Sequence, residues 1–209
     1  MFSNRFDFSH KLCTWFLWLL LPVGVWLISY APDSWGYENG ILENSQNILL
    51  MLCILFCITA KQHKSLYLFF AAVTLFLLFR EVNCGRVLLW SRSGEIFHCG
   101  PAQDYLKWKE IPHGSLIRAS VYVFLSSLCL LAFCRKGNLR SLYQTILCTK
   151  IPVWETAFLI IGILVGVISE RANICFIAEE VGEILMYSAF ASAIYRYSRG
   201  IQSPICAKK

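Results

Sequence analysis

The sequence predicts an all-α fold: a polytopic transmembrane helical bundle of about six spans, forming a single integral membrane domain over residues 1–209. Composition is the first reason, because 57% of the residues are hydrophobic and only 15% are charged, which is too apolar for a soluble domain. The second reason is that the apolar residues fall in windows of about twenty, the length that an α-helix needs to cross a membrane. The expected spans are 12–30, 41–60, 66–90, 115–134, 151–169 and 176–195.

The first window follows a short polar head. A cleaved signal peptide is the alternative interpretation, since Ser29-Tyr30-Ala31 is similar to a small-x-small cleavage site. Pro32 stands directly after that site, and the apolar core is longer than in typical signal sequences. Both features favour a retained membrane anchor.

The second window begins with polar residues, Glu43 among them, and is apolar afterwards. The windows over residues 115–134 and 151–169 are apolar in their middle parts, and the latter contains a Gly-x-x-x-Gly pair at Gly162 and Gly166. Such a pair lets a neighbouring helix approach closely, and we expect packing inside the bundle rather than dimerisation.

The third window contains ionisable residues within its apolar run: Arg80, Glu81 and Arg86. A helix that starts at Leu66 places Glu81 about 22 Å along its axis. This position is inside a hydrocarbon layer of about 30 Å. Ionisable residues at such a depth face protein or a watery cavity and indicate a functional site by default.

The sixth window begins with three acidic residues, Glu179, Glu180 and Glu183. Their spacings of three and four residues place them on one helix face, and Tyr187 continues that face one turn deeper. Carboxylates so close together in a low dielectric take up protons, bind a cation or pair with arginine.

The distribution of Lys and Arg predicts that both termini are cytoplasmic. The head, the 61–64 loop, the 135–150 loop and the tail carry two, two, four and four basic residues, whereas the 31–40 loop carries none. Only the 91–114 loop weakens this bias. The net charge of +6 is therefore explained by membrane topology, and no nucleic-acid partner is expected.

This topology brings polar residues of five spans to the outer half of the membrane, whereas the inner half offers little apart from Glu155. We expect an outer-leaflet cluster of carboxylates and arginines, with Arg118 and Arg171 as further ion-pair partners. The candidate ligand-binding residues are Glu43, Arg80, Glu81, Arg86, Glu179, Glu180 and Glu183.

Three functions remain open for this cluster. The preferred one is binding or movement of a small polar group (a lipid headgroup, an ion or a solute), in which arginines hold an anionic group and carboxylates hold protons or a cation. The second is a membrane-embedded enzyme acting on lipid, with Glu81 or Glu180 as general base and a divalent metal activating water. The third is a structural or assembly protein whose ion pairs only fix the helix register.

Partners and cofactors follow from these alternatives. Membrane lipids are expected partners, and a membrane-protein partner or a homo-oligomer is compatible with each function. The sequence predicts no particular cofactor, and a divalent metal enters only as a ligand or in the catalytic alternative. The two loop histidines, His98 and His113, are expected to be solvated. Cys84, Cys99 and Cys175 are expected near the outer side, where one pair is bridged if that side is oxidising.

Short motifs carry a resemblance to a group of small uncharacterised bacterial polytopic inner-membrane proteins. The motifs are Glu38-Asn39-Gly40 followed by Glu43, Phe79-Arg80-Glu81 followed by Gly85-Arg86, and Glu179-Glu180 followed by Glu183. The resemblance covers the second, third and sixth spans. It implies a multi-pass protein of the bacterial inner membrane and carries over no reaction.

The sequence departs from the seven-span ceramidase-like intramembrane hydrolases, which coordinate zinc with histidines and an aspartate. It has four histidines, none of them in an expected span, and no His-x-x-x-His. A zinc hydrolase of that type is therefore not expected, whereas a carboxylate-based analogue remains open.

Overall fold

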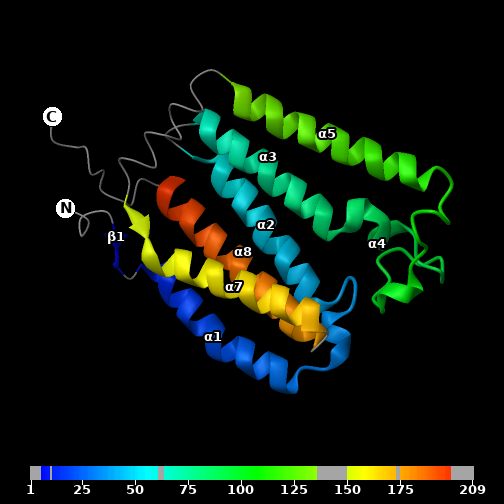
Figure 1. The fold of residues 1–209 in the computed structure, drawn as a ribbon, viewed down its shortest axis with the longest axis horizontal. Coiled ribbons are helices and arrows are strands. Elements are labelled where there is room, and N and C mark those ends of the chain that lie inside the picture. Colours follow the sequence, from blue (N-terminus) through cyan, green and yellow to red (C-terminus); the bar gives the residue numbers. More distant parts are fainter. Residues whose placement is uncertain (1–5, 10, 61–63, 136–149, 173–174, 199–209) are drawn as a thin grey trace.

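A computed structural model describes residues 6–9, 11–60, 64–135, 150–172 and 175–198, and it shows a bundle of long helices (Figure 1). Its helices are α1 (Leu12–Tyr30), α2 (Ile41–Ile58), α3 (Lys64–Glu81), α4 (Arg86–Leu89), α5 (Gly114–Cys134), α7 (Val153–Ala172) and α8 (Phe176–Ser198). Single turns of 3₁₀-helix lie at η2 (Asp33–Gly36), η3 (Asn83–Gly85) and η4 (Ala102–Asp104). Two short parallel strands, β1 (Phe6–Asp7) and β2 (Ile151–Pro152), pair in the register Phe6↔Ile151 and Asp7↔Pro152.

The long helices alternate in direction along the chain (Figure 1). The two ends of the bundle are therefore formed by different sets of connecting residues. At one end α1 begins and α8 ends, and we call it the terminal end. At the other end lie residues 31–40 and 82–113, and we call it the loop end. The helices contact one another in the order α5, α3, α2 and α8, with α7 and α1 packed on the far side of α8.

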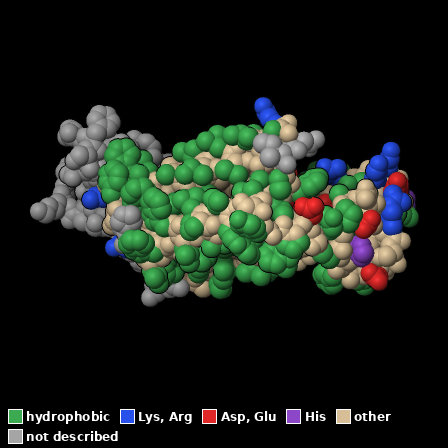
Figure 2. Space-filling view, turned by 90° about the horizontal axis from the view of Figure 1, so that it is seen from below, with side chains coloured by type: hydrophobic (Ala, Val, Ile, Leu, Met, Phe, Trp, Pro, Cys, Tyr) green, Lys and Arg blue, Asp and Glu red, His purple; other side chains and the backbone are tan. Residues whose placement is uncertain are grey.

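Four helices of the described chain, α1, α2, α5 and α7, are long and apolar enough to cross a membrane, and the bent pair α3–α4 makes a fifth if it is counted as one span. Figure 2 shows a flank of the molecule covered largely by hydrophobic side chains, with charged side chains and histidine gathered at the loop end. The chain is therefore an all-helical protein of membrane type. The basic segments 61–63, 136–149 and 199–209, on which the expected orientation depends, lie outside the described residues.

The helix α8 is as long as these spans but is more polar. Buried residues recur along its whole length, from Ile177 to Ser198. It contacts α1, α2 and α7, and polar side chains such as Ser192 and Arg196 are buried in these contacts. A helix in such a position needs less apolar surface than one that faces the membrane.

The third expected span, residues 66–90, is not one continuous helix. The helix α3 ends at Glu81, and the chain bends by 55° before α4. Asn83, Cys84 and Gly85 follow one another with φ of 47°, 54° and 83°. Such left-handed conformations are unfavourable for residues with a Cβ and easy only for glycine. Because a right-handed α-helix requires negative φ, it cannot continue through these three residues.

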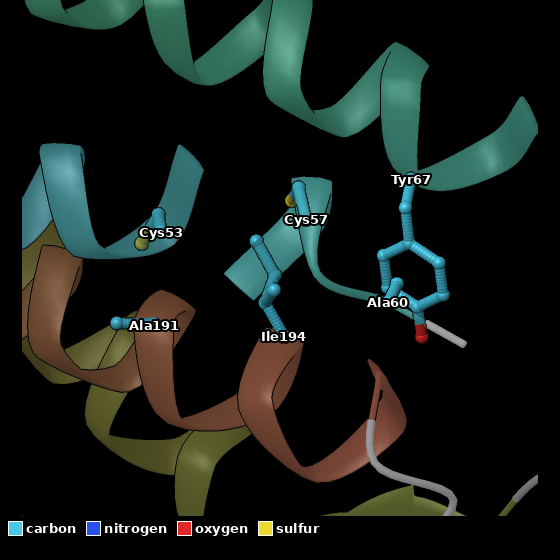
Figure 3. Close-up of a cluster of buried hydrophobic side chains, with 6 residues drawn as sticks. All are labelled: Cys53, Cys57, Ala60, Tyr67, Ala191 and Ile194. Carbon is cyan, nitrogen blue, oxygen red and sulfur yellow. The ribbon is translucent and has the colours of Figure 1, made fainter. Parts of the chain in front are cut away.

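Small residues lie at two helix contacts of the core. Cys53 and Cys57 of α2 pack against Ala191 and Ile194 of α8 and against Tyr67 of α3 (Figure 3). On the opposite side of α8, the expected close packing of the Gly-x-x-x-Gly pair inside the bundle is confirmed.

The partner of that pair is Gly182 of α8. A Cβ added to Gly182 would lie 2.6 Å from the backbone nitrogen of Gly166, and one added to Gly162 would lie 2.6 Å from the backbone nitrogen of Met186. Neither distance is sterically allowed, so glycine at these positions is what lets α7 and α8 touch backbone to backbone. Cys175, just before α8, is a free thiol. Cys84 and Cys99, at the loop end, are free thiols as well.

Candidate functional site

A polar cavity of about 460 Å³ opens at the loop end between α2, α3, α8 and the loops that cover them. Its wall combines six carboxylates with one guanidinium. Aromatic and small side chains, among them Tyr37 and Phe176, complete it. The charged residues of the wall are Glu38, Glu43, Arg80, Glu81, Glu179, Glu180 and Glu183.

Four elements bring these residues together. The turn before α2 carries Glu38, and the first turn of α2 carries Glu43. The last residues of α3 supply Arg80 and Glu81, because the helix ends there. The first two turns of α8 supply the remaining glutamates on one face, as their spacing predicts.

Several of the carboxylates are held by hydrogen bonds within the fold. The hydroxyl of Tyr187 donates to Glu81 Oε1 at 2.6 Å. The side-chain amide of Gln46, which is fully buried, donates to Glu180 Oε2 at 2.5 Å. These donors fix the direction of the carboxylates.

The α2 side of the wall is fixed from the loop. The backbone N–H of Asn39 donates to Glu43 Oε2, and the Asn39 side chain donates to the carbonyls of Val87 and His98 at 2.6 and 2.8 Å. Asn39 therefore ties the beginning of α2 to the 90–113 loop. Tyr105 strengthens this tie, since its hydroxyl contacts the carbonyls of Glu38 and His98.

Arg86, one of the seven expected site residues, does not reach the cavity wall. Its guanidinium lies 3.8 Å from Glu38 Oε1, donates to the carbonyl of Leu106 at 3.3 Å and sits over the ring of Tyr105. The break after Glu81 turns Arg86 away from the end of α3. It thus supports Glu38 from behind the wall.

The cavity wall carries more acidic side chains than basic ones. Arg80 faces six glutamates, and it interacts electrostatically with Glu81 and Glu183. Among the described residues, the arginine ion pairs at this end join Arg86 to Glu38 and Arg92 to Glu110, and none joins Arg80 to a wall glutamate. The expected partner Arg118 instead lies over the ring of Tyr122.

Glu38 and His98 are among the loop groups of this end whose pKa values are shifted. Burial raises the pKa of Glu38 above its ordinary value of 4.5; the nearby Arg86 opposes this shift and Glu81 reinforces it. Hydrogen bonds to Glu95 and Asp104 raise the pKa of His98, which lies in the loop as expected but is not simply solvated. Glu38 and His98 therefore retain their protons to higher pH than free side chains do, whereas the hydrogen bond from the backbone N–H of Lys107 lowers the pKa of Glu110.

The described residues contain no group of three or more His, Cys, Asp or Glu side chains arranged to hold a metal ion. The glutamates of the wall line a space of about 460 Å³. This volume is within the range of about 300–1,000 Å³ that is usual for small-molecule sites.

A second charged cluster, at the terminal end, is missed by sequence reasoning. Arg196 is fully buried and donates from Nη1 to both oxygens of Glu155, at 2.7 and 2.8 Å. Its Nη2 donates to Asp7 Oδ2 at 2.7 Å. The sequence signal was present: Ser188, Ser192 and Arg196 are spaced by four residues and form a polar stripe on α8.

Comparison of this chain with models of protein families, with curated proteins and with solved structures gives no match.

Proposed function

We propose that this protein is a multi-pass membrane protein whose loop-end cavity binds a small positively charged group, such as an ammonium-bearing solute or headgroup. The observation that supports this proposal is the wall itself: six carboxylates and one guanidinium around about 460 Å³ of space. Carboxylates in such a partly buried site are stabilised by a cation or by protons. The aromatic rings of Tyr37 and Phe176 at the same wall suit an organic cation, which is attracted to ring faces.

The cavity supports this function over a purely structural cluster. A structural plug requires each glutamate to be paired with an arginine and the space between them to be filled. Here the carboxylates outnumber the guanidinium, and a cavity separates them. In the alternative of a membrane-embedded enzyme, Glu81 or Glu180 is the general base. Turnover of a bound ligand would establish this alternative.

We also propose that the protein has six spans in a bacterial inner membrane, with α1 beginning and α8 ending at the cytoplasmic side. The coinciding ends of α1 and α8 and the burial of α8 support this arrangement. Cys99 at the loop end and Cys134 at the terminal end are both exposed thiols. In variants in which Cys99 or Cys134 is the single cysteine left in the chain, a membrane-impermeant maleimide is applied to intact spheroplasts. It should label Cys99 at once and Cys134 only after permeabilisation. The reverse pattern would refute the orientation.

Native mass spectrometry and thermal unfolding of the purified protein test the binding proposal. The probes are ethanolammonium, choline and Mg²⁺, added to the wild type and to Glu81→Gln, Glu180→Gln and Glu95→Gln. Glu95 is the matched control, because its side chain is 70% exposed and lies outside the cavity wall. We expect an ammonium probe to bind and stabilise the wild type and the control, and binding to fall about tenfold in the two cavity variants. Equal responses of all four proteins, or no response, would contradict the proposal.

A further inference from the structure

A second large cavity lies in the terminal half of the bundle, where α1, α2 and α8 meet. It has a volume of about 560 Å³, within the range of about 300–1,000 Å³ that is usual for ligand pockets. Its walls are mostly apolar, with Phe16 of α1 facing the α2 side chains Leu49 and Leu52. We call it the terminal groove.

Small side chains on α8 create this hollow. Ser188, Ala191 and Ser192 form the floor of the groove and are spaced by three and four residues, so they share one face of the helix. Ser192 also donates to Glu155 Oε1 at 3.2 Å, which ties the floor to the buried Arg196 cluster. The position of Ser192 in the floor is therefore fixed by a hydrogen bond, and the small side chains beside it leave the groove open.

The groove extends to about the depth of one membrane leaflet. Leu49 lies nine residues before the end of α2 at Ile58, which corresponds to about 14 Å along the helix axis. Half of a hydrocarbon layer of about 30 Å is about 15 Å. An acyl chain that enters from the terminal end would therefore be accommodated along the groove.

One cation lies at the groove. Lys11 is the residue directly before α1, at the terminal end, and it lines the groove together with the apolar side chains. Among the described residues, no carboxylate forms a direct ion pair with it; Asp7, which pairs directly with Arg196, interacts with Lys11 electrostatically at longer range. A lysine at the end of an apolar slot is complementary to an anionic headgroup whose chain occupies the slot.

We propose that the terminal groove is a binding site for an anionic phospholipid of the leaflet at the terminal end. One acyl chain lies between Phe16 and Leu52 over the small residues of α8, and the headgroup phosphate pairs with the Lys11 ammonium. This site lies at the opposite end of the bundle from the glutamate cavity and does not depend on the function proposed for that cavity.

Photo-crosslinking of the full-length protein in nanodiscs tests this site. The nanodiscs consist of phosphatidylcholine with a small fraction of phosphatidylglycerol that carries a diazirine in the middle of its acyl chain. We expect adducts to concentrate on the residues that line the groove in α1, α2 and α8. Adducts spread evenly over the exposed faces of α5 and α7 would overturn the proposal, because they would show ordinary annular lipid.

Matched variants separate the acyl chain from the headgroup. Leu52→Trp fills the groove, whereas Leu131→Trp makes the same change on the exposed surface of α5, outside the groove. We expect several-fold fewer groove adducts in Leu52→Trp and no change in Leu131→Trp. Equal effects of the two variants would overturn the assignment of the chain.

For the headgroup, the same labelled acyl chain is presented on phosphatidylglycerol and on phosphatidylcholine. We expect the wild type and the control Lys64→Gln, whose lysine is exposed at the same end, to favour phosphatidylglycerol about five-fold. Lys11→Gln should lose this preference. Equal labelling by the two lipids in the wild type would overturn the pairing with Lys11. Circular dichroism and size-exclusion chromatography identify any variant that fails to fold. Lys11→Met then replaces Lys11→Gln, and Leu52→Phe replaces Leu52→Trp.

Discussion

At the scale of single residues, Arg196–Glu155 is the most deeply buried ion pair among the described residues, so each partner depends strongly on the other. Both side chains are almost fully buried, at 0% and 1% exposure, and Thr14 also donates to Glu155, at 2.8 Å. Burying two charges is costly, and here the cost is offset by hydrogen bonds that use both oxygens of the carboxylate. The pair and Asp7 also join the strand before α1 to the end of α8.

Arg196→Gln should therefore destabilise the protein strongly. The substitution leaves Glu155 buried without its counter-charge, which costs about 3–5 kcal/mol. The matched control is Arg92→Gln, which breaks an exposed ion pair with Glu110 and should cost about 0–1 kcal/mol. Reversible unfolding in mixed micelles measures both changes. A loss of the same size in the two variants would show that the buried pair has no special role.

The residues of the loop-end cavity could be predicted to a large extent from the sequence. Counting along helices gives the expected height of a side chain in the membrane, and it predicts similar heights for Glu43, Glu81 and Glu183. The same counting fails for Arg86, because it treats residues 66–90 as one helix and does not see the break. It also fails for Arg196, which looks like part of a basic tail until Glu155 is brought beside it.

At the scale of helices, the α7–α8 contact shows how short motifs decide packing. Gly162 and Gly166 are visible in the sequence as a pair, but their partner Gly182 is an isolated glycine in a polar helix. Only the structure shows that its missing side chain is what lets the two backbones meet. Sequence reasoning thus finds one half of the contact.

Gly182→Ala and Gly166→Ala should differ sharply in stability, although both add one methyl group. The new Cβ at position 182 would lie 2.6 Å from the backbone nitrogen of Gly166, whereas at position 166 the nearest atom would be 3.9 Å away. We expect Gly182→Ala to lower the free energy of unfolding by about 1–3 kcal/mol and Gly166→Ala to have little effect. Thermal unfolding of the two variants provides the comparison, and equal stability would contradict the close contact.

The break after α3 is the element that sequence reasoning describes least well. An apolar pattern continues from Val87 to Trp90 and favours an unbroken span, because hydropathy does not register backbone conformation. Asn83, Cys84 and Gly85 adopt left-handed conformations that end the helix. This break exposes the end of α3 to the cavity, so Arg80 and Glu81 lie at its wall rather than along a lipid-facing helix.

At the scale of the whole molecule, the two cavities and the buried Arg196 ion pair all lie along α8. Its first turns face the loop-end cavity, its small residues form the floor of the terminal groove, and its last turn holds Arg196. The sequence predicts a helical membrane bundle from composition and window length. It does not predict that the most polar helix is central, because which helices surround it is a property of the packing.

The sign of the ligand's charge is the central claim of the proposed function, and Arg80→Gln tests it most directly. This variant removes the one cation of the cavity wall and leaves the six carboxylates in place. Equilibrium binding of radiolabelled ethanolammonium to the purified protein is measured for Arg80→Gln, for Glu183→Gln and for the wild type. If the cavity binds cations, Arg80→Gln should bind the probe about five- to tenfold more tightly and Glu183→Gln more weakly. Weaker binding in Arg80→Gln, or no change in either variant, would contradict a cation-binding cavity.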